Sequence, residues 1–302
     1  MVNPVVLAFS AAVGLAVLFL VLDYAYSRRV RARAAARPPR PRIEPFLLNG
    51  AGRPALLLIH GFADTPSVFA QLAPPLAAAG FAVRAMRLSG SGVPPAEMHG
   101  TTFAGWRGEI DREIAALRAA DPARPVWLVG HSLGGALAFD AALRPANRIA
   151  GLVLLAPLIA VSRARSPLLS PRQWFHLLDR LLVFSRVVES RLPADLHDPA
   201  ARAAYRTDKF IHRDIYRAVF AAIAAVEARA ADWPGPLFMA VADADQIVDA
   251  PAARRFFAAA RARPAELLAP PGAGHVLPLD HGHARLADAV RRFIQAAPAL
   301  PP

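Results

Sequence analysis

One short segment constrains the fold of this chain more than any other. Residues 126–135 read Val-Trp-Leu-Val-Gly-His-Ser-Leu-Gly-Gly, which places Gly130, Ser132 and Gly134 at the spacing G-x-S-x-G. An apolar run precedes these residues and small residues follow them, so the pattern predicts a strand, a sharp turn and a helix. The glycines allow close packing, and Ser132 would stand clear of the sheet beside a helix N-terminus that stabilises negative charge. The segment therefore predicts an α/β sheet with an exposed serine oxygen at its carboxyl edge.

From residue 43 onward, apolar runs alternate with stretches of helical pattern. Continuous apolar runs of strand length indicate strands that are buried on both faces. The predicted strands are residues 55–59, 82–86, 126–129, 152–155, 237–241 and 265–268. The main predicted helices are residues 103–119, 134–143, 251–260 and 286–296. We therefore expect a mostly parallel sheet with helices on both faces.

The segment between residues 155 and 237 shows no convincing strand pattern. Its apolar residues recur at helical spacing, which for most of them indicates core packing. They are Trp174, Leu177, Leu178, Leu181 and Leu182, followed by Ile215, Val219, Phe220, Ile223 and Val226. Helices inserted between two strands can lie over the carboxyl edge of the sheet. We therefore expect residues 158–232 to form a helical cap above Ser132, and residues 43–157 and 233–298 to form the core.

The N-terminal segment has a different composition. Residues 5–22 are apolar except for Ser10, and at about 1.5 Å per residue they extend about 27 Å as a helix, enough to cross a bilayer core. A cleaved signal peptide would have basic residues before the apolar run and a small-residue site after it. Here the first basic residue is Arg28, and Asp23 directly follows the run. The sequence predicts an uncleaved transmembrane anchor over residues 4–23 and a basic, proline-bearing linker over residues 24–42.

The positive charge of the chain is concentrated after this anchor. The formal net charge is +12, and the clustered basic residues are Arg28, Arg29, Arg31, Arg33, Arg37, Arg40 and Arg42. The remaining excess is dispersed, so we expect no nucleic-acid partner. Basic flanks stay on the cytoplasmic side of a span, which predicts a single-pass membrane protein with its globular domain in the cytoplasm. The chain has no cysteine, which excludes disulfides and a cysteine nucleophile.

A serine becomes a nucleophile when a base removes its proton and an acid orients that base. His275 lies in a glycine-rich loop after the last predicted strand, from which it could reach over the carboxyl edge of the sheet. His281 and His283 are more typical of the start of the final helix, and without a third ligand we expect no metal site there. In the cap, His197 and His212 are interpreted as surface or packing residues.

Three aspartates compete for the position of the acid after the strand at 237–241. Asp243 is closest to the strand, and Asp245 precedes the apolar pair Ile247 and Val248. Asp249 precedes Ala-Pro and suits a helix N-cap. Spacing alone leaves the choice open.

Stabilising an oxyanion requires two backbone N–H groups aimed at one point. Leu133, directly after the serine, could supply one of them. The loop after the strand at 55–59 reads His60-Gly61-Phe62, and the N–H of Phe62 is the second candidate.

Taken together, these segments resemble the α/β-hydrolase family, and more narrowly its capped carboxylesterases and monoacylglycerol lipases, often grouped with serine aminopeptidase-like hydrolases. The resemblance extends over roughly residues 45–297 and identifies Asp245 as the acid of a catalytic triad with Ser132 and His275. One departure is that residues 88–92 read Leu-Ser-Gly-Ser-Gly, where the family commonly has Pro-Gly-His-Gly.

The resemblance implies an α/β-hydrolase fold with a helical cap and a serine hydrolase that cleaves carboxylic esters through an acyl-enzyme on Ser132, without cofactor or metal. The apolar cap residues favour a hydrophobic acyl substrate, such as a monoacylglycerol or a medium-chain ester. An amide or peptide hydrolase with the same triad is the main alternative, although the cap carboxylates are scattered among arginines. A non-catalytic membrane-bound scaffold is less favoured, because all three triad positions are filled.

Overall fold

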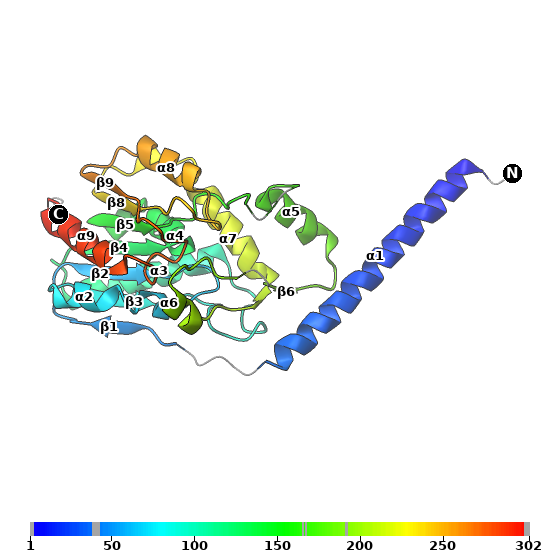
Figure 1. The fold of residues 1–302 in the computed structure, drawn as a ribbon, viewed down its shortest axis with the longest axis horizontal. Helices are drawn as coiled ribbons and strands as arrows, with labels where there is room; N and C mark the ends of the chain where they lie inside the picture. Colours follow the sequence, from blue (N-terminus) through cyan, green and yellow to red (C-terminus); the bar gives the residue numbers. More distant parts are fainter. Residues whose placement is uncertain (1–2, 38–42, 165, 167, 191–192, 299–302) are drawn as a thin grey trace.

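The computed structural model describes residues 3–37, 43–164, 166, 168–190 and 193–298 of the chain. Its body is a sheet flanked by helices, with a smaller helical layer on one side (Figure 1). A long N-terminal helix, α1 (Pro4–Ala35), projects away from this body.

The sheet has seven strands in the order β1-β3-β2-β4-β5-β8-β9, and only β1 runs antiparallel to its neighbour. The strands are β1 (Phe46–Leu48), β2 (Ala55–Ile59), β3 (Ala82–Met86), β4 (Val126–His131), β5 (Gly151–Leu155), β8 (Leu237–Ala240) and β9 (Ala265–Leu268). Every residue of β2, β4, β5 and β8 is buried, which explains their continuous apolar sequences. The expected parallel sheet is confirmed, and β1 is a short edge strand that the sequence analysis missed.

Helices cover both faces of the sheet. They are α2 (Ala73–Ala78), α3 (Phe103–Ala120), α4 (Leu133–Ala142), α8 (Ala250–Ala259) and α9 (His283–Ala296), with short 3₁₀ turns η1 (Pro66–Phe69), η2 (Pro145–Asn147) and η3 (Ala230–Asp232). On one face α2 packs beside α9, and on the other α4 packs beside α3 and, through Phe139 and Phe256, beside α8. The four main helices predicted from the sequence are therefore present.

The layer over the carboxyl edge of the sheet comes from the segment between β5 and β8, which we call the cap. It contains α5 (Pro171–Leu181), α6 (Pro199–Ala204) and α7 (Arg213–Val226). It also contains an antiparallel pair of short strands, β6 (Val187–Glu189) and β7 (Phe210–His212), so the expectation of a cap without strands was wrong. Strands of three residues are too short to produce a recognisable alternation.

The two long cap helices are packed differently. Six residues of α7 are buried, and this helix lies against α4 and α3. Within α5, which the structure describes throughout, no residue is buried. The expectation of core packing therefore holds for α7, whereas Leu177, Leu178 and Leu181 of α5 are exposed.

The helix α1 is longer than the predicted anchor. Its most apolar 18-residue window has a mean hydropathy of 2.9, and none of that window is buried, so its length and composition fit a membrane span or a signal sequence. The helix continues to Ala35 through residues predicted as linker. These residues are mostly alanine and arginine, which are strong helix formers, and prolines begin only at Pro38. Residues 38–42 of the predicted linker lie outside the described residues.

Candidate active site

Ser132 occupies a strained turn between β4 and α4. Its backbone has φ 54° and ψ −118°, a conformation that residues other than glycine rarely adopt. The backbone around this turn is closely packed, because a Cβ at Gly134 would lie 1.9 Å from the carbonyl oxygen of Ile59. A Cβ at Gly130 would lie 2.2 Å from the carbonyl oxygen of Gly134. The two glycines therefore allow the tight strand–turn–helix arrangement that the motif predicted.

Two loops at the carboxyl edge of the sheet bring the predicted partners to this serine. His275 lies between β9 and α9, and its Nε2 is 2.9 Å from Ser132 Oγ. Its Nδ1 is 2.8 Å from Asp245 Oδ2, in the loop after β8. With the proton on Nδ1 donated to the carboxylate, Nε2 is free to accept the proton of the serine hydroxyl. The structure thus brings Ser132, His275 and Asp245 into one hydrogen-bonded chain, and all three are buried.

The three competing aspartates have different environments. Asp245 Oδ1 accepts hydrogen bonds from the N–H groups of Ile247 and Val248, each at 2.8 Å. Burial acts to raise the pKa of Asp245, but the charge and hydrogen bond of His275 and these N–H groups outweigh it and hold the pKa below its usual value. Asp243 is exposed and pairs with Arg254. Asp249 caps α8, as its position predicted.

Two aspartates that the sequence analysis did not single out hold the loops of the triad. Asp195 belongs to the cap, and its Oδ2 accepts hydrogen bonds from the N–H groups of Gln246 at 2.8 Å and His275 at 3.2 Å. It therefore connects the loop of Asp245 with the loop of His275. Asp280 is fully buried and accepts the N–H of Gly274 at 2.7 Å. No local pattern marks these contacts, because the partners of Asp195 are distant in the sequence.

His131, next to the serine, supports the same loop from the sheet side. Its Nε2 is 3.1 Å from the carbonyl oxygen of His275. Burial, followed by the proximity of His275, lowers the pKa of His131 to about 3. The ring is therefore neutral near pH 7, and its Nε2–H can donate to the carbonyl of His275.

The loop with the second oxyanion candidate runs directly against the serine. A Cβ at Gly61 would lie 3.1 Å from Ser132 Cβ, a tighter contact than most Cβ atoms make, so glycine favours this close approach. His60 holds the loop in place, because its Nε2 accepts the N–H of Leu88 at 3.1 Å and its Nδ1 lies 2.9 Å from the carbonyl of Gly61. Leu133 is the first residue of α4, where an N–H has no acceptor within the helix.

A cavity of about 500 Å³ opens above these residues, and Ser132, His275 and Phe62 form part of its wall. The cap supplies most of the apolar lining, with Trp174, Phe175, Leu178, Leu182, Val219 and Phe220. Part of the apolar sequence between β5 and β8 therefore lines the cavity beside the candidate site.

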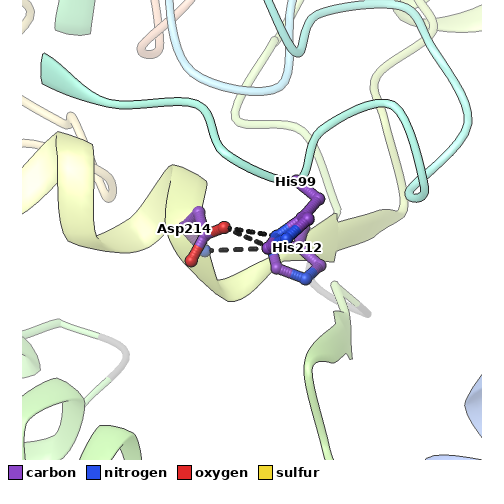
Figure 2. Close-up of side chains that lie close together, drawn as sticks. All are labelled: His99, His212 and Asp214. Atoms are coloured by element: carbon purple, nitrogen blue, oxygen red, sulfur yellow. Dashed lines mark hydrogen bonds and ion pairs between the residues drawn. The ribbon is translucent and has the colours of Figure 1, made fainter.

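A separate group of polar side chains joins the cap to the core (Figure 2). Asp214 Oδ2 lies 2.9 Å from His99 Nδ1, 3.2 Å from His212 Nδ1 and 2.9 Å from the N–H of Gly100. Two histidines and a carboxylate can bind a transition metal, and the ligand atoms lie within 4.8 Å of one another. However, these hydrogen bonds already satisfy Oδ2, and Arg217 occupies Oδ1 at 2.9 Å. We interpret the group as a set of polar contacts that attaches the cap to the core. The sequence analysis missed His99 and interpreted His212 as a packing or surface residue.

Comparison with known proteins places the chain in a family. The family model described as serine aminopeptidase, S33, matches residues 50–282, so the chain belongs to this family of α/β-hydrolases. Among curated proteins, it is 34% identical over 94 residues to the thermostable monoacylglycerol lipase of Bacillus sp. (strain H-257), covering 31% of this chain and 36% of that one. It is 27% identical over 199 residues to the monoacylglycerol lipase of Mycolicibacterium smegmatis, covering 64% of this chain and 70% of that one. The first of these matches thus spans about a third of its relative's length.

Solved structures confirm the α/β-hydrolase fold. A structure reported with the metagenome-derived lipolytic enzymes LipS and LipT has a TM-score of 0.74 and 22% identity over 85% of this chain and 99% of that one. The monoacylglycerol lipase of Paleococcus ferrophilus has a TM-score of 0.70 and 23% identity over 84% and 98% of the two chains.

Proposed function

We propose that this protein is a serine hydrolase that cleaves carboxylic esters with a hydrophobic acyl group. The observation that carries the proposal is the hydrogen-bonded chain from Ser132 Oγ through His275 to Asp245 at the wall of an apolar cavity. The similarity to two monoacylglycerol lipases supports the same substrate class.

In the first half of the reaction, Ser132 Oγ attacks the ester carbonyl while His275 Nε2 takes the serine proton. The ionised Asp245 orients the imidazole and stabilises its positive charge. The N–H groups of Phe62 and Leu133 bind the oxyanion. His275 then gives the proton to the departing alcohol, which leaves the acyl group as an ester on Ser132.

In the second half, water attacks the acyl-enzyme and His275 takes a proton from that water. Collapse of the second oxyanion releases the carboxylic acid, and the proton returns from His275 to Ser132 Oγ. The neutral His131 holds the backbone of His275 in position throughout, through the 3.1 Å contact with its carbonyl oxygen.

The carboxylates of the cavity do not favour the amide alternative. An aminopeptidase needs a carboxylate that is available for the free amine of its substrate. Among the described residues of the cavity wall, the carboxylates are Asp179, Asp195 and Asp208. Asp179 pairs with Arg217, Asp195 binds the triad loops, and Asp208 binds the N–H of Gly92 at 2.8 Å. We therefore favour esters over peptides.

A substrate panel tests this proposal. The full chain in detergent is assayed with p-nitrophenyl esters and monoacylglycerols of increasing acyl length, and with aminoacyl p-nitroanilides. We expect hydrolysis of the esters, a preference for medium or longer chains, and loss of that activity in Ser132→Ala. Faster turnover of the anilides, or ester turnover that survives in Ser132→Ala, would contradict the proposal.

We also propose that α1 anchors the protein as a single-pass membrane protein, with the core (residues 43–157 and 233–298) and the cap (residues 158–232) in the cytoplasm. The apolar window with a mean hydropathy of 2.9 and the arginines after it support this orientation. A reporter that is active only in the periplasm, fused to the C-terminus, should give no signal while the protein remains in the membrane fraction. A strong signal would reverse the orientation, and release of a shortened protein would identify a cleaved signal peptide.

A further inference from the structure

The second half of α1 packs against the cap along one face of the helix. Asp23, Ser27 and Val30 are its buried residues, at the i, i+4, i+7 spacing that defines one side of a helix. The apolar half that precedes them is exposed and projects away from the body (Figure 1). The part of α1 that packs against the cap therefore begins at Asp23, directly after the apolar run.

Asp23 binds the turn between α5 and β6. Its Oδ2 accepts the N–H groups of Val183 at 2.7 Å and Phe184 at 2.8 Å, and its Oδ1 accepts the N–H of Ser185 at 3.2 Å. The hydroxyl of Ser27, one helical turn later, donates to the carbonyl of Phe184 at 2.7 Å. Because three backbone N–H groups donate hydrogen bonds to the buried carboxylate of Asp23, the contact between α1 and this turn has a defined geometry.

Further contacts extend this interface along α1. The rings of Tyr24 and Phe184 meet edge to face, with centroids 5.4 Å apart. Arg33, near the end of α1, forms a 2.9 Å ion pair with Glu189 at the end of β6. The family match begins at residue 50, so α1 lies outside the part of the chain that the family model covers, whereas the cap residues that it contacts lie inside that part.

The cap segment that binds α1 also forms part of the cavity wall. Leu182 and Val188 line the cavity, whereas Val183, Phe184 and Glu189 beside them contact α1. Leu178 of α5 also lines the cavity, one helical turn before Leu182. The segment that binds α1 therefore lies directly beside the cavity.

Exposed apolar side chains surround the same turn. Leu177, Leu181, Val183 and Phe184 are exposed by 41%, 46%, 56% and 40% of their surface. If residues 5–22 lie in the bilayer, Asp23 marks the bilayer boundary, and the turn that it binds lies at the same depth. Trp174, on the same helix, faces the cavity, so α5 separates this apolar surface from the site.

We propose that the docking of α1 through Asp23 holds the exposed face of α5 and the following turn against the surface of the bilayer that α1 crosses, so that a single-chain lipid ester passes from that bilayer into the cavity. The proposal rests on the membrane anchor and ester hydrolase activity proposed above. The exposed Arg28 and Arg29 follow the apolar run and would face anionic lipid headgroups. The bilayer is thus the partner of this apolar surface, because α1, which crosses the bilayer, is docked directly beside the surface.

A depth measurement tests the docking without depending on activity. Because the chain has no cysteine, Val183→Cys and Ala296→Cys each give a unique site for an environment-sensitive fluorophore. Ala296 is exposed at the end of α9, which lies at the far side of the body from α1 (Figure 1). The labelled full chains are reconstituted in phosphatidylcholine–phosphatidylglycerol vesicles that contain lipids with nitroxide-labelled headgroups.

We expect strong quenching of the label at position 183 and little at position 296. Adding Asp23→Ala should lower the quenching at position 183 to the level at position 296. An unquenched label at position 183 would overturn the membrane contact, and quenching that is insensitive to Asp23→Ala would overturn the role of the docked helix.

A comparison of two substrates tests the consequence for lipid entry. Asp23→Ala should lower the turnover of a monoacylglycerol embedded in vesicles by about tenfold, because local presentation of the substrate is lost. The turnover of soluble p-nitrophenyl butyrate should stay unchanged. Asp198→Ala serves as the control, because it removes the aspartate at the N-cap of α6 in the same layer. This variant should leave the ratio of the two rates unchanged.

Equal losses on both substrates in Asp23→Ala, or no loss on either, would contradict lipid entry controlled by α1. If the unmodified protein hydrolyses neither substrate while the quenching pattern is as expected, the ester hydrolase proposal fails and the docking stands.

Discussion

The core and the cap differ in how completely their elements are buried. In the core, β2, β4, β5, β8 and all of α4 are buried, so hydrophobic burial fixes their positions. The cap is attached both through the six buried residues of α7 and through polar contacts, such as Asp208 with the N–H of Gly92 and the Asp214 group in Figure 2, whereas none of the described residues of α5 is buried. Regions with few buried apolar contacts open more readily than packed cores. We therefore expect α5 to open more readily than α7 or the core that carries Ser132, His275 and Asp245.

The separation is incomplete at Asp195. This residue belongs to the cap, yet it binds the backbone of His275 and Gln246 in the core. The cap therefore helps to position His275, the proposed base, as well as to line the cavity.

The largest effect is expected within the core. Asp245→Asn removes the charge that orients and stabilises the imidazole of His275, and turnover should fall by about 10⁴-fold. Asp243→Asn is the matched control, because Asp243 is exposed in the same loop and pairs with Arg254. Steady-state ester hydrolysis by the two variants compares them directly. A comparable loss confined to Asp243→Asn would show that the assignment of the acid is wrong by two positions.

A smaller effect is expected where the cap reaches the triad. Asp195→Ala removes the acceptor for the N–H groups of His275 and Gln246, and the resulting misplacement should lower kcat by about 10- to 100-fold. Asp195→Asn keeps a carbonyl oxygen and should restore part of this loss. Asp179→Ala, another cap aspartate on the cavity wall, should leave kcat near that of the unmodified protein. Equal kcat for Asp195→Ala and Asp179→Ala would confine the cap to a covering role.

The buried His131 should make the core sensitive to acid. Its folded-state pKa is about 3, against 6.5 for the free side chain, so between these values the unfolded chain binds the extra proton. Stability therefore rises with pH through this window and is fully present above it, with a contribution on the order of a few kcal/mol. His131→Gln should flatten the pH dependence of the melting temperature between pH 4 and pH 7. An unchanged slope would show that His131 does not titrate as this environment requires.

The smallest effect is expected at Asp249, the N-cap residue of the core helix α8. Asp249→Ala removes the side chain that accepts the N–H of Ala252, which should cost about 1 kcal/mol of stability. Thermal unfolding should show this loss, while ester turnover at low temperature stays close to normal. A collapse of turnover without a change in melting temperature would assign Asp249 to the chemistry instead.

The strands and the serine turn could be predicted because they depend on local sequence. Continuous apolar runs specify buried parallel strands, and the glycines around Ser132 specify the sharp turn. The N-cap position of Asp249 was likewise local, since Pro251 follows it at the start of a helix. The choice of Asp245 needed the family resemblance, because spacing alone could not separate three aspartates in one loop.

The parts that could not be predicted depend on distant contacts. Asp23 and Ser185 are 162 positions apart, and Asp195 and His275 are 80 apart, so no local pattern marks either pair. The exposure of α5 was also missed, because an amphipathic pattern shows that a helix has an apolar face but not what covers that face. The helical continuation of α1 was not predicted, because the prolines after residue 37 favour an extended linker.

The central claim is that Ser132 is the nucleophile of the triad, and covalent labelling tests it most directly. The full chain is treated with a fluorophosphonate probe, and the modified peptide is identified by mass spectrometry. We predict a single adduct on Ser132, none in Ser132→Ala, and much slower labelling in His275→Ala than in His281→Ala or His283→Ala. Undiminished labelling of Ser132→Ala, or an adduct on another serine, would contradict the account.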